Sequence, residues 1–145
     1  MIRPEFLACP ILVVDDTNMV RVMLVRHLKH TGFTNVTECV NGQEALDLLR
    51  ARPFDLVLLD INMPVLDGYG TLAAMRADET LRQVSVIMVT AVDAIESVAT
   101  CIEHGAEDYM PKLFNPILLD ARIHACLERR HLRRRVAELE AAAGA

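Results

Sequence analysis

The sequence is poor in aromatic residues, and its cysteines follow no recognisable pattern. Aromatic side chains make up 4% of the 145 residues and tryptophan is absent, so aliphatic residues and methionine must fill any core. The four cysteines contain no CxxC pair, which argues against a disulfide framework or a zinc site. We expect these thiols to be reduced and mostly buried: Cys9, Cys39, Cys101 and Cys126. We also expect four methionines to pack in the core: Met19, Met23, Met75 and Met88.

The sequence also lacks an excess of positive charge and long apolar runs. The formal net charge of −5 argues against a general nucleic-acid or membrane-surface binder. No apolar run approaches the roughly 20 residues of a membrane-spanning helix, and the first five residues show no signal-peptide pattern. A hydrophobic content of 52% is ample for the core of one domain. These features predict a soluble cytoplasmic domain with neither nucleic acid nor a membrane as partner.

Short apolar runs alternate along the chain with longer stretches of helical period. The predicted strands are 11–14, 36–40, 56–59, 84–89 and 108–110. The predicted helices are 18–30, 42–50, 69–77, 94–104 and 116–139. Gly32 and Gly105 stand where the first and fourth helices should end. Five βα units in a row predict an α/β fold in which helices cover both faces of a parallel sheet, and the near-continuous apolar strands fit that burial.

Polar residues follow the predicted strands at the points where the strands end. They are Asp15 and Asp16, then Asp60, Thr90 and Lys112. Singly, each is more often a helix cap, a turn residue or a surface charge. Ligands of parallel α/β sheets, however, bind outside the carboxyl ends of the strands, where three carboxylates would repel one another. Mg²⁺ relieves such repulsion and accepts phosphoryl oxygens, and a carboxylate can itself accept a phosphoryl group.

Four motifs in register resemble those of the response-regulator receiver family of two-component signalling, along residues 11 to about 128. They are Val14-Asp15-Asp16, the segment Asp-Ile-Asn-Met-Pro-Val-Leu-Asp-Gly at 60–68, Val89-Thr90-Ala91 and Tyr109-Met110-Pro111-Lys112. The resemblance implies a flavodoxin-like (βα)5 fold, a doubly wound parallel sheet with strand order 2-1-3-4-5. It also implies a phosphorelay function, in which a partner histidine kinase phosphorylates Asp60.

The resemblance also implies the ligands of the metal ion. Asp16 and Asp60 would hold Mg²⁺ together with the backbone carbonyl of Asn62, while Asp15 would act largely through water. Such a domain is not an enzyme toward other molecules, because it catalyses only its own phosphorylation and dephosphorylation.

The remaining motif residues would contact the phosphoryl group or respond to it. The resemblance implies that Lys112 and Thr90 bind the group and that the small Ala91 leaves access to it. Tyr109 stands at the position of the family's aromatic switch, which turns inward when Thr90 moves toward the phosphate.

One position departs from the family pattern. Leu113 follows Lys112 where the family usually has a proline with a cis bond. A non-proline cis bond costs roughly 3–4 kcal/mol, so we predict a trans bond between these two residues. The loop should then shift, so that Lys112 reaches Asp60 only once the phosphoryl group is bound.

Two other functions fit parts of the pattern. A phosphatase of the dehalogenase class requires Asp-x-Asp after its first strand, whereas here the adjacent pair Asp15-Asp16 stands there and Asp60 comes after the third. A receiver-shaped scaffold that binds partners without phosphorylation would not need the complete set of acids with Thr90 and Lys112.

The last predicted helix continues beyond what is needed to cover the sheet, which is complete by about Leu127. We therefore divide the chain into a receiver domain at 1–128 and a helical extension at 129–145. Leu132, Val136 and Leu139 follow at spacings of four and three, the seam of a coiled coil. This seam predicts a homodimer, or a connection to the output domain of a longer chain. The arginines within 129–135 are interpreted as a solvated helix face rather than a nucleic-acid site.

Overall fold

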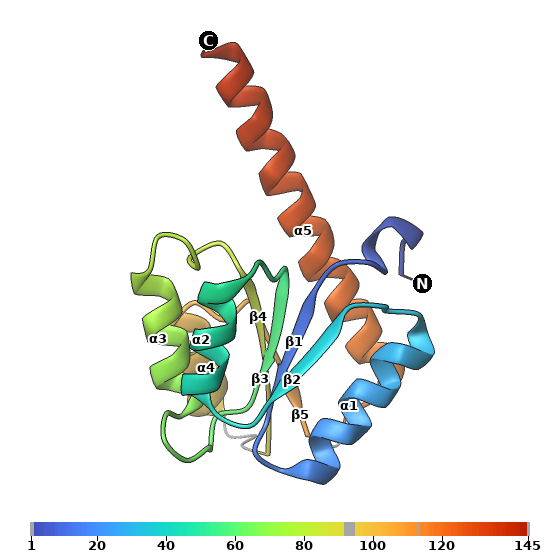
Figure 1. Ribbon diagram of the computed structural model, residues 1–145, viewed down its shortest axis with the longest axis vertical. Helices are drawn as coiled ribbons and strands as arrows, with labels where there is room; N and C mark the ends of the chain where they lie inside the picture. Colours follow the sequence, from blue (N-terminus) through green and yellow to red (C-terminus); the bar gives the residue numbers. More distant parts are fainter. Residues whose placement is uncertain (1, 92–94, 113, 145) are drawn as a thin grey trace.

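The computed structural model describes residues 2–91, 95–112 and 114–144 and contains one five-stranded parallel sheet (Figure 1). Its strands are β1 (Ile11–Val14), β2 (Val36–Cys39), β3 (Leu56–Leu59), β4 (Ser85–Thr90) and β5 (Asp108–Pro111). The sheet order is β2-β1-β3-β4-β5, and all four neighbouring pairs are parallel. The predicted flavodoxin-like fold and strand order are therefore confirmed.

Helices cover both faces of the sheet. The helices are α1 (Asn18–Thr31), α2 (Gly42–Ala51), α3 (Gly68–Ala77), α4 (Ile95–Glu103) and α5 (Pro116–Ala143), preceded by a short 3-10 turn, η1 (Pro4–Phe6). Leu12 and Val14 of β1 belong to one apolar cluster with residues of α2, α3 and α4. Ile11 and Val13 of the same strand belong to a second cluster with residues of α1 and α5. Because successive side chains of a strand point to opposite faces, the continuous apolar run in β1 supplies both clusters, and Figure 1 shows the two helical layers.

Glycines follow the ends of α1 and α4 as the sequence predicts, and a polar side chain caps the start of α2. Asn41 accepts a hydrogen bond from the Glu44 amide at the start of α2 (2.9 Å). Gly32 ends α1 with φ 116° and Gly105 follows α4 with φ 100°, backbone conformations that L side chains rarely adopt. The predicted elements match the observed ones to within a few residues at each end. Ala94, the first residue of the predicted fourth helix, lies outside the described residues.

The core prediction is right for two of the four methionines. Met75 and Met88 are fully buried, whereas Met19 and Met23 of α1 are exposed. The helix buries a narrow stripe, Leu24, Val25 and Leu28. Met19 and Met23 lie outside this stripe, about 140° and 100° around the helix from Leu24. The cysteine prediction is confirmed: all four are free thiols, and all but the half-buried Cys9 are buried.

Helix α5 has 28 residues and projects well beyond the sheet (Figure 1). Leu127 is its last buried residue, and Leu132, Val136 and Leu139 are exposed. In the parts of the chain that the structure describes, no helix, α5 included, is both long and apolar enough to cross a membrane.

The arginines of α5 form ion pairs with carboxylates of the sheet. The interpretation of a solvated face is wrong for Arg130, whose side chain is 11% exposed. The side chains of Arg129, Arg133 and Arg134 stay about half exposed. Arg130 and Arg134 both pair with Asp55, at 2.9 and 2.7 Å. Glu107 pairs with Arg129 and Arg133 instead, at 3.1 and 2.8 Å. We call Arg129, Arg130, Arg133 and Arg134 the arginine clamp. The clamp forms because two carboxylates at the starts of strands face this stretch of helix.

Candidate functional site

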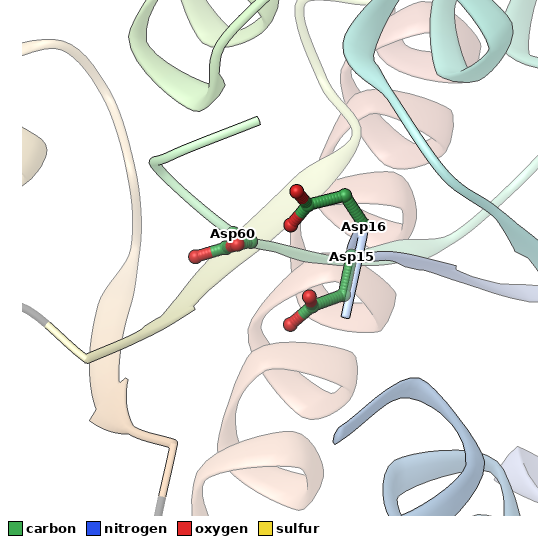
Figure 2. Close-up of side chains that lie close together, drawn as sticks. All are labelled: Asp15, Asp16 and Asp60. Atoms are coloured by element: carbon green, nitrogen blue, oxygen red, sulfur yellow. The ribbon is translucent and has the colours of Figure 1, made fainter. Parts of the chain in front are cut away.

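Three carboxylates meet at the carboxyl edge of the sheet (Figure 2). Asp15 and Asp16 follow β1 and Asp60 follows β3, and these strands are paired with Val14 opposite Leu59. One oxygen from each aspartate lies within 4.8 Å of one from each of the other two. Asp15 and Asp60 are buried and Asp16 is exposed. The register of two neighbouring strands thus creates the cluster that the sequence predicts.

The buried Asp15 carboxylate is only half satisfied by the protein. Its Oδ1 accepts a hydrogen bond from the Thr17 amide (2.8 Å), while its buried Oδ2 has no hydrogen-bond partner among the described residues. Burial raises the pKa of Asp15, and the charges of Asp60 and Asp16 raise it further, against the opposing effects of Thr17 and Lys112. A divalent cation between the three carboxylates would relieve this repulsion, and hard oxygen ligands of this kind suit Mg²⁺.

Lys112 provides the positive charge of the site. Its Nζ lies 3.1 Å from Asp60 Oδ2 and 3.5 Å from Asp15 Oδ1. Burial alone would lower the pKa of Lys112, but the hydrogen bond to Asp60 and the charges of Asp60 and Asp15 outweigh it, so the pKa is raised. The expectation that Lys112 reaches Asp60 only with a phosphoryl group is therefore wrong. The two aspartates already attract the ammonium group, and the Lys112 amide is held by the Thr90 carbonyl (3.0 Å).

The peptide bond between Lys112 and Leu113 was predicted to be trans. Leu113 lies outside the described residues, so this prediction falls outside them too.

The other predicted residues occupy the same edge of the sheet or the strands leading to it. Thr90 is the last residue of β4 and is fully buried. Tyr109 is half-buried on β5, where it pairs in register with Met88 of β4. Asn62 is exposed in the loop two residues after Asp60, and Ala91 is exposed directly after Thr90. The predicted site residues therefore lie in one region, because parallel strands end at a common edge of the sheet.

Gly68 lies against the backbone of Asp60, and sequence reasoning assigned it no role. Its amide donates to the Ile61 carbonyl (2.7 Å), which closes the loop that follows Asp60. A Cβ atom at this position would lie 2.2 Å from the Asp60 carbonyl oxygen, closer than real contacts allow. The Asp-Gly pair that ends the loop was visible in the sequence, but the close approach to Asp60 exists only in the folded chain.

Comparisons with known proteins agree with this geometry. Residues 11–124 match the family model described as the response regulator receiver domain. The chain is 40% identical over 119 residues to the "Probable transcriptional regulator ycf27" of Cyanidium caldarium, an alignment covering 82% of this chain and 46% of that protein. It is 36% identical to the chemotaxis protein CheY of Pseudomonas aeruginosa, covering 82% of this chain and 96% of CheY.

A solved structure shows the same arrangement of elements. The CheY-like response regulator receiver domain protein of Methanospirillum hungatei superposes with a TM-score of 0.79 at 25% identity, covering 87% of this chain and 98% of that one. The chain spans about half the length of the ycf27 proteins that it matches.

Proposed function

The chain belongs to the response regulator receiver domain family, and from that premise we propose that Asp60 accepts a phosphoryl group from a partner histidine kinase. The observation that carries the proposal is the meeting of Asp15, Asp16 and Asp60 with Lys112 Nζ, 3.1 Å from Asp60 Oδ2. An Asp60 oxygen would attack phosphorus as the bond from phosphorus to the histidine nitrogen breaks, giving an aspartyl phosphate. Water would later cleave this mixed anhydride, releasing phosphate and restoring the carboxylate. The domain would thus be a catalyst of its own phosphorylation and dephosphorylation alone.

The three aspartates are proposed to hold Mg²⁺, with the Asn62 carbonyl as a further ligand and Asp15 acting largely through water. When bound, the ion neutralises carboxylate charge and draws phosphoryl oxygens toward Asp60. The unpartnered Oδ2 of the buried Asp15 supports this proposal. It leaves an acceptor in the site that a cation, or a water bound to one, would satisfy.

Lys112 and Thr90 are proposed to bind the phosphoryl oxygens. Lys112 already lies against Asp60, so it would move from the carboxylate to the incoming group by a small displacement. Thr90 ends the neighbouring strand β4, and Tyr109, on β5, would change position when Thr90 does. Local electrostatic changes of this kind alter a signalling surface when they favour one of two packings.

We also propose two kinds of partner for this chain. A histidine kinase would supply the phosphoryl group in the cytoplasm. The long α5 helix would pass the signal onward, to a second copy of the chain or to an output domain that continues from it.

Phosphorylation by acetyl phosphate with Mg²⁺, followed by intact-mass spectrometry, tests the proposal without a kinase. We expect a phosphoryl adduct on the wild-type protein, none on Asp60→Asn and much less on Asp16→Ala. Asp67→Asn is the matched control, because Asp67 is an exposed carboxylate near the site that caps α3 and lies outside the cluster. A full adduct on Asp60→Asn would overturn the assignment of the acceptor.

A further inference from the structure

The extension of α5 carries an exposed apolar seam. Leu132, Val136 and Leu139 are 54%, 52% and 53% exposed. Their spacings of four and three residues place them on one face of the helix, as positions d, a and d of a heptad. An isolated helix of this length is marginal in water, and an apolar stripe of this kind is stabilised when another helix covers it.

The two clamp arginines that pair with Asp55 lie on the face of the helix opposite the seam. Arg130 and Arg134, which pair with Asp55, each lie about 160° around the helix from Leu132. Arg129 and Arg133, which pair with Glu107, lie nearer the seam, at about 60° and 100° from Leu132. Only the part of the clamp that binds Asp55 is therefore nearly opposite the apolar face. The apolar seam stays exposed and accessible to a second molecule.

The charges beside the seam select the orientation of that second molecule. With Val136 at position a, Arg135 is at g and Glu140 is at e of the next heptad. In a parallel pair of helices these two positions meet across the interface, so Arg135 of each copy would face Glu140 of the other. In an antiparallel pair centred on Val136, the two Arg135 side chains would face each other instead and repel.

Both charged residues are available for this contact. Among the described residues, Arg135 pairs with Glu138 of the same helix at 3.4 Å, and the two side chains are 61% and 67% exposed. Exposed ion pairs of this kind contribute little to stability. Glu140 is exposed and forms no ion pair within the part of the chain that the structure describes.

A hollow at the base of the seam provides further room for a second helix. It has a volume of about 260 Å³ and is lined by His124, Ala125, Glu128, Arg129 and Leu132. Ala125 falls at a heptad position of the seam, whereas Arg129, at the next such position, pairs with Glu107 of its own domain.

We infer that the α5 extension pairs in parallel with the same segment of a second copy of this chain, through Leu132, Val136 and Leu139, with Arg135 of each copy against Glu140 of the other. The two receiver domains then lie at the same end of the helix pair. This inference does not depend on the proposed phosphorylation, since it concerns a surface far along α5 from Asp60.

The apolar part is tested by sedimentation velocity of the full chain over a concentration series up to the millimolar range. Two variants place the same charge on different faces of the extension: Val136→Lys in the seam and the control Ala141→Lys, at an exposed position away from it. We expect the wild type and Ala141→Lys to associate, and Val136→Lys to raise the dissociation constant at least tenfold. A monomeric wild type throughout the series, or equal association of Val136→Lys, would overturn the inference.

The parallel orientation is tested by exchanging charges in the same assay. Arg135→Glu and Glu140→Arg should each weaken self-association, because like charges then meet across the interface. Mixing these two variants should restore association as a heterodimer, since both pairs are again of opposite sign. The double variant R135E/E140R should also restore association. In an antiparallel pair, position 135 of each copy would face position 135 of the other. Arg135→Glu would then exchange one like-charge contact for another and leave association unchanged. Failure of the double variant to recover would overturn the parallel arrangement, and unchanged association of both single variants would overturn the charge pairing.

Discussion

Arg130 Nε donates to Asp55 Oδ1 across 2.9 Å, and both side chains are only 11% exposed. Asp55 directly precedes β3, the strand that leads to Asp60. Glu107 has the same relation to β5, which leads to Lys112, and it pairs with Arg129 and Arg133 of α5. The arginine clamp therefore joins the extension to the starts of two strands whose far ends carry the candidate site. These ion pairs anchor the first turns of the extension to the sheet.

Removing the charge of Asp55 should destabilise the protein. Asp55→Asn leaves Arg130 without its ionised partner in a mostly buried position, and a hydrogen bond to a charged group contributes roughly 2 kcal/mol. We expect a loss of about that size in the free energy of unfolding, measured by urea denaturation. Glu138→Gln is the control, because it removes an exposed pair within the helix. Equal losses in both variants would contradict a structural role for the clamp.

The clamp should also make stability depend on pH in the acid range. Burial would raise the pKa of Asp55, but Arg130 and Arg134 outweigh it, with a smaller contribution from Cys9 in the same direction, and the net pKa is lowered. The pKa of Glu107 is lowered in the same way, by Arg133, Ser85 and Arg129 against burial.

Carboxyl groups with a lowered pKa in the folded state contribute stability above their ordinary values of 3.8 and 4.5, and that contribution is lost as the pH falls below them. The free energy of unfolding should therefore fall between about pH 5 and pH 3. The fall should be shallower in the double variant D55N/E107Q, which lacks both groups. If the free energy of unfolding falls equally with pH in the wild type and in D55N/E107Q, the clamp does not contribute to acid sensitivity.

Asp15 should lower the stability of the metal-free protein. Burial raises its pKa, its Oδ2 lacks a partner among the described residues, and Asp60 and Asp16 add repulsion. Asp15→Asn keeps an acceptor for the Thr17 amide while removing the charge. We expect it to raise the free energy of unfolding by about 1–2 kcal/mol without Mg²⁺ and to reduce the further stabilisation that Mg²⁺ gives. Asp16→Asn, at the exposed neighbour, should have the smaller effect without metal; a loss of stability in Asp15→Asn would refute the prediction.

Gly68 should tolerate no side chain. In Gly68→Ala the new Cβ would lie 2.2 Å from the Asp60 carbonyl oxygen, so the loop after β3 must move away from the site. We expect a loss of about 2 kcal/mol in unfolding free energy and a weaker phosphoryl adduct with acetyl phosphate. Gly144→Ala serves as control, because its Cβ would come no closer than 3.4 Å to a neighbouring atom. Wild-type labelling and stability in Gly68→Ala would contradict the close approach.

The sequence by itself determined the fold and the membership of the site. Continuous apolar runs in β1 and β3 require helices on both faces, and the strands of such a sheet end at one edge. Two of the aspartates, Asp15 and Asp60, directly follow a strand, and Asp16 follows Asp15. All three were therefore predictable as neighbours from the sequence. Their chemistry followed from residue type, since clustered carboxylates attract a divalent cation.

Only the tertiary structure decided which charges pair and which apolar residues stay exposed. Arg130 and Asp55 are 75 residues apart in sequence, so no local pattern pairs them. The exposure of Met19 and Met23 depends on how α1 is rotated against the sheet, and the contact of Lys112 with Asp60 depends on the backbone after β5. Hydrophobic period and strand ends are local properties of a chain. Ion pairs and the exposed face of a helix arise from packing between distant segments, which no local pattern records.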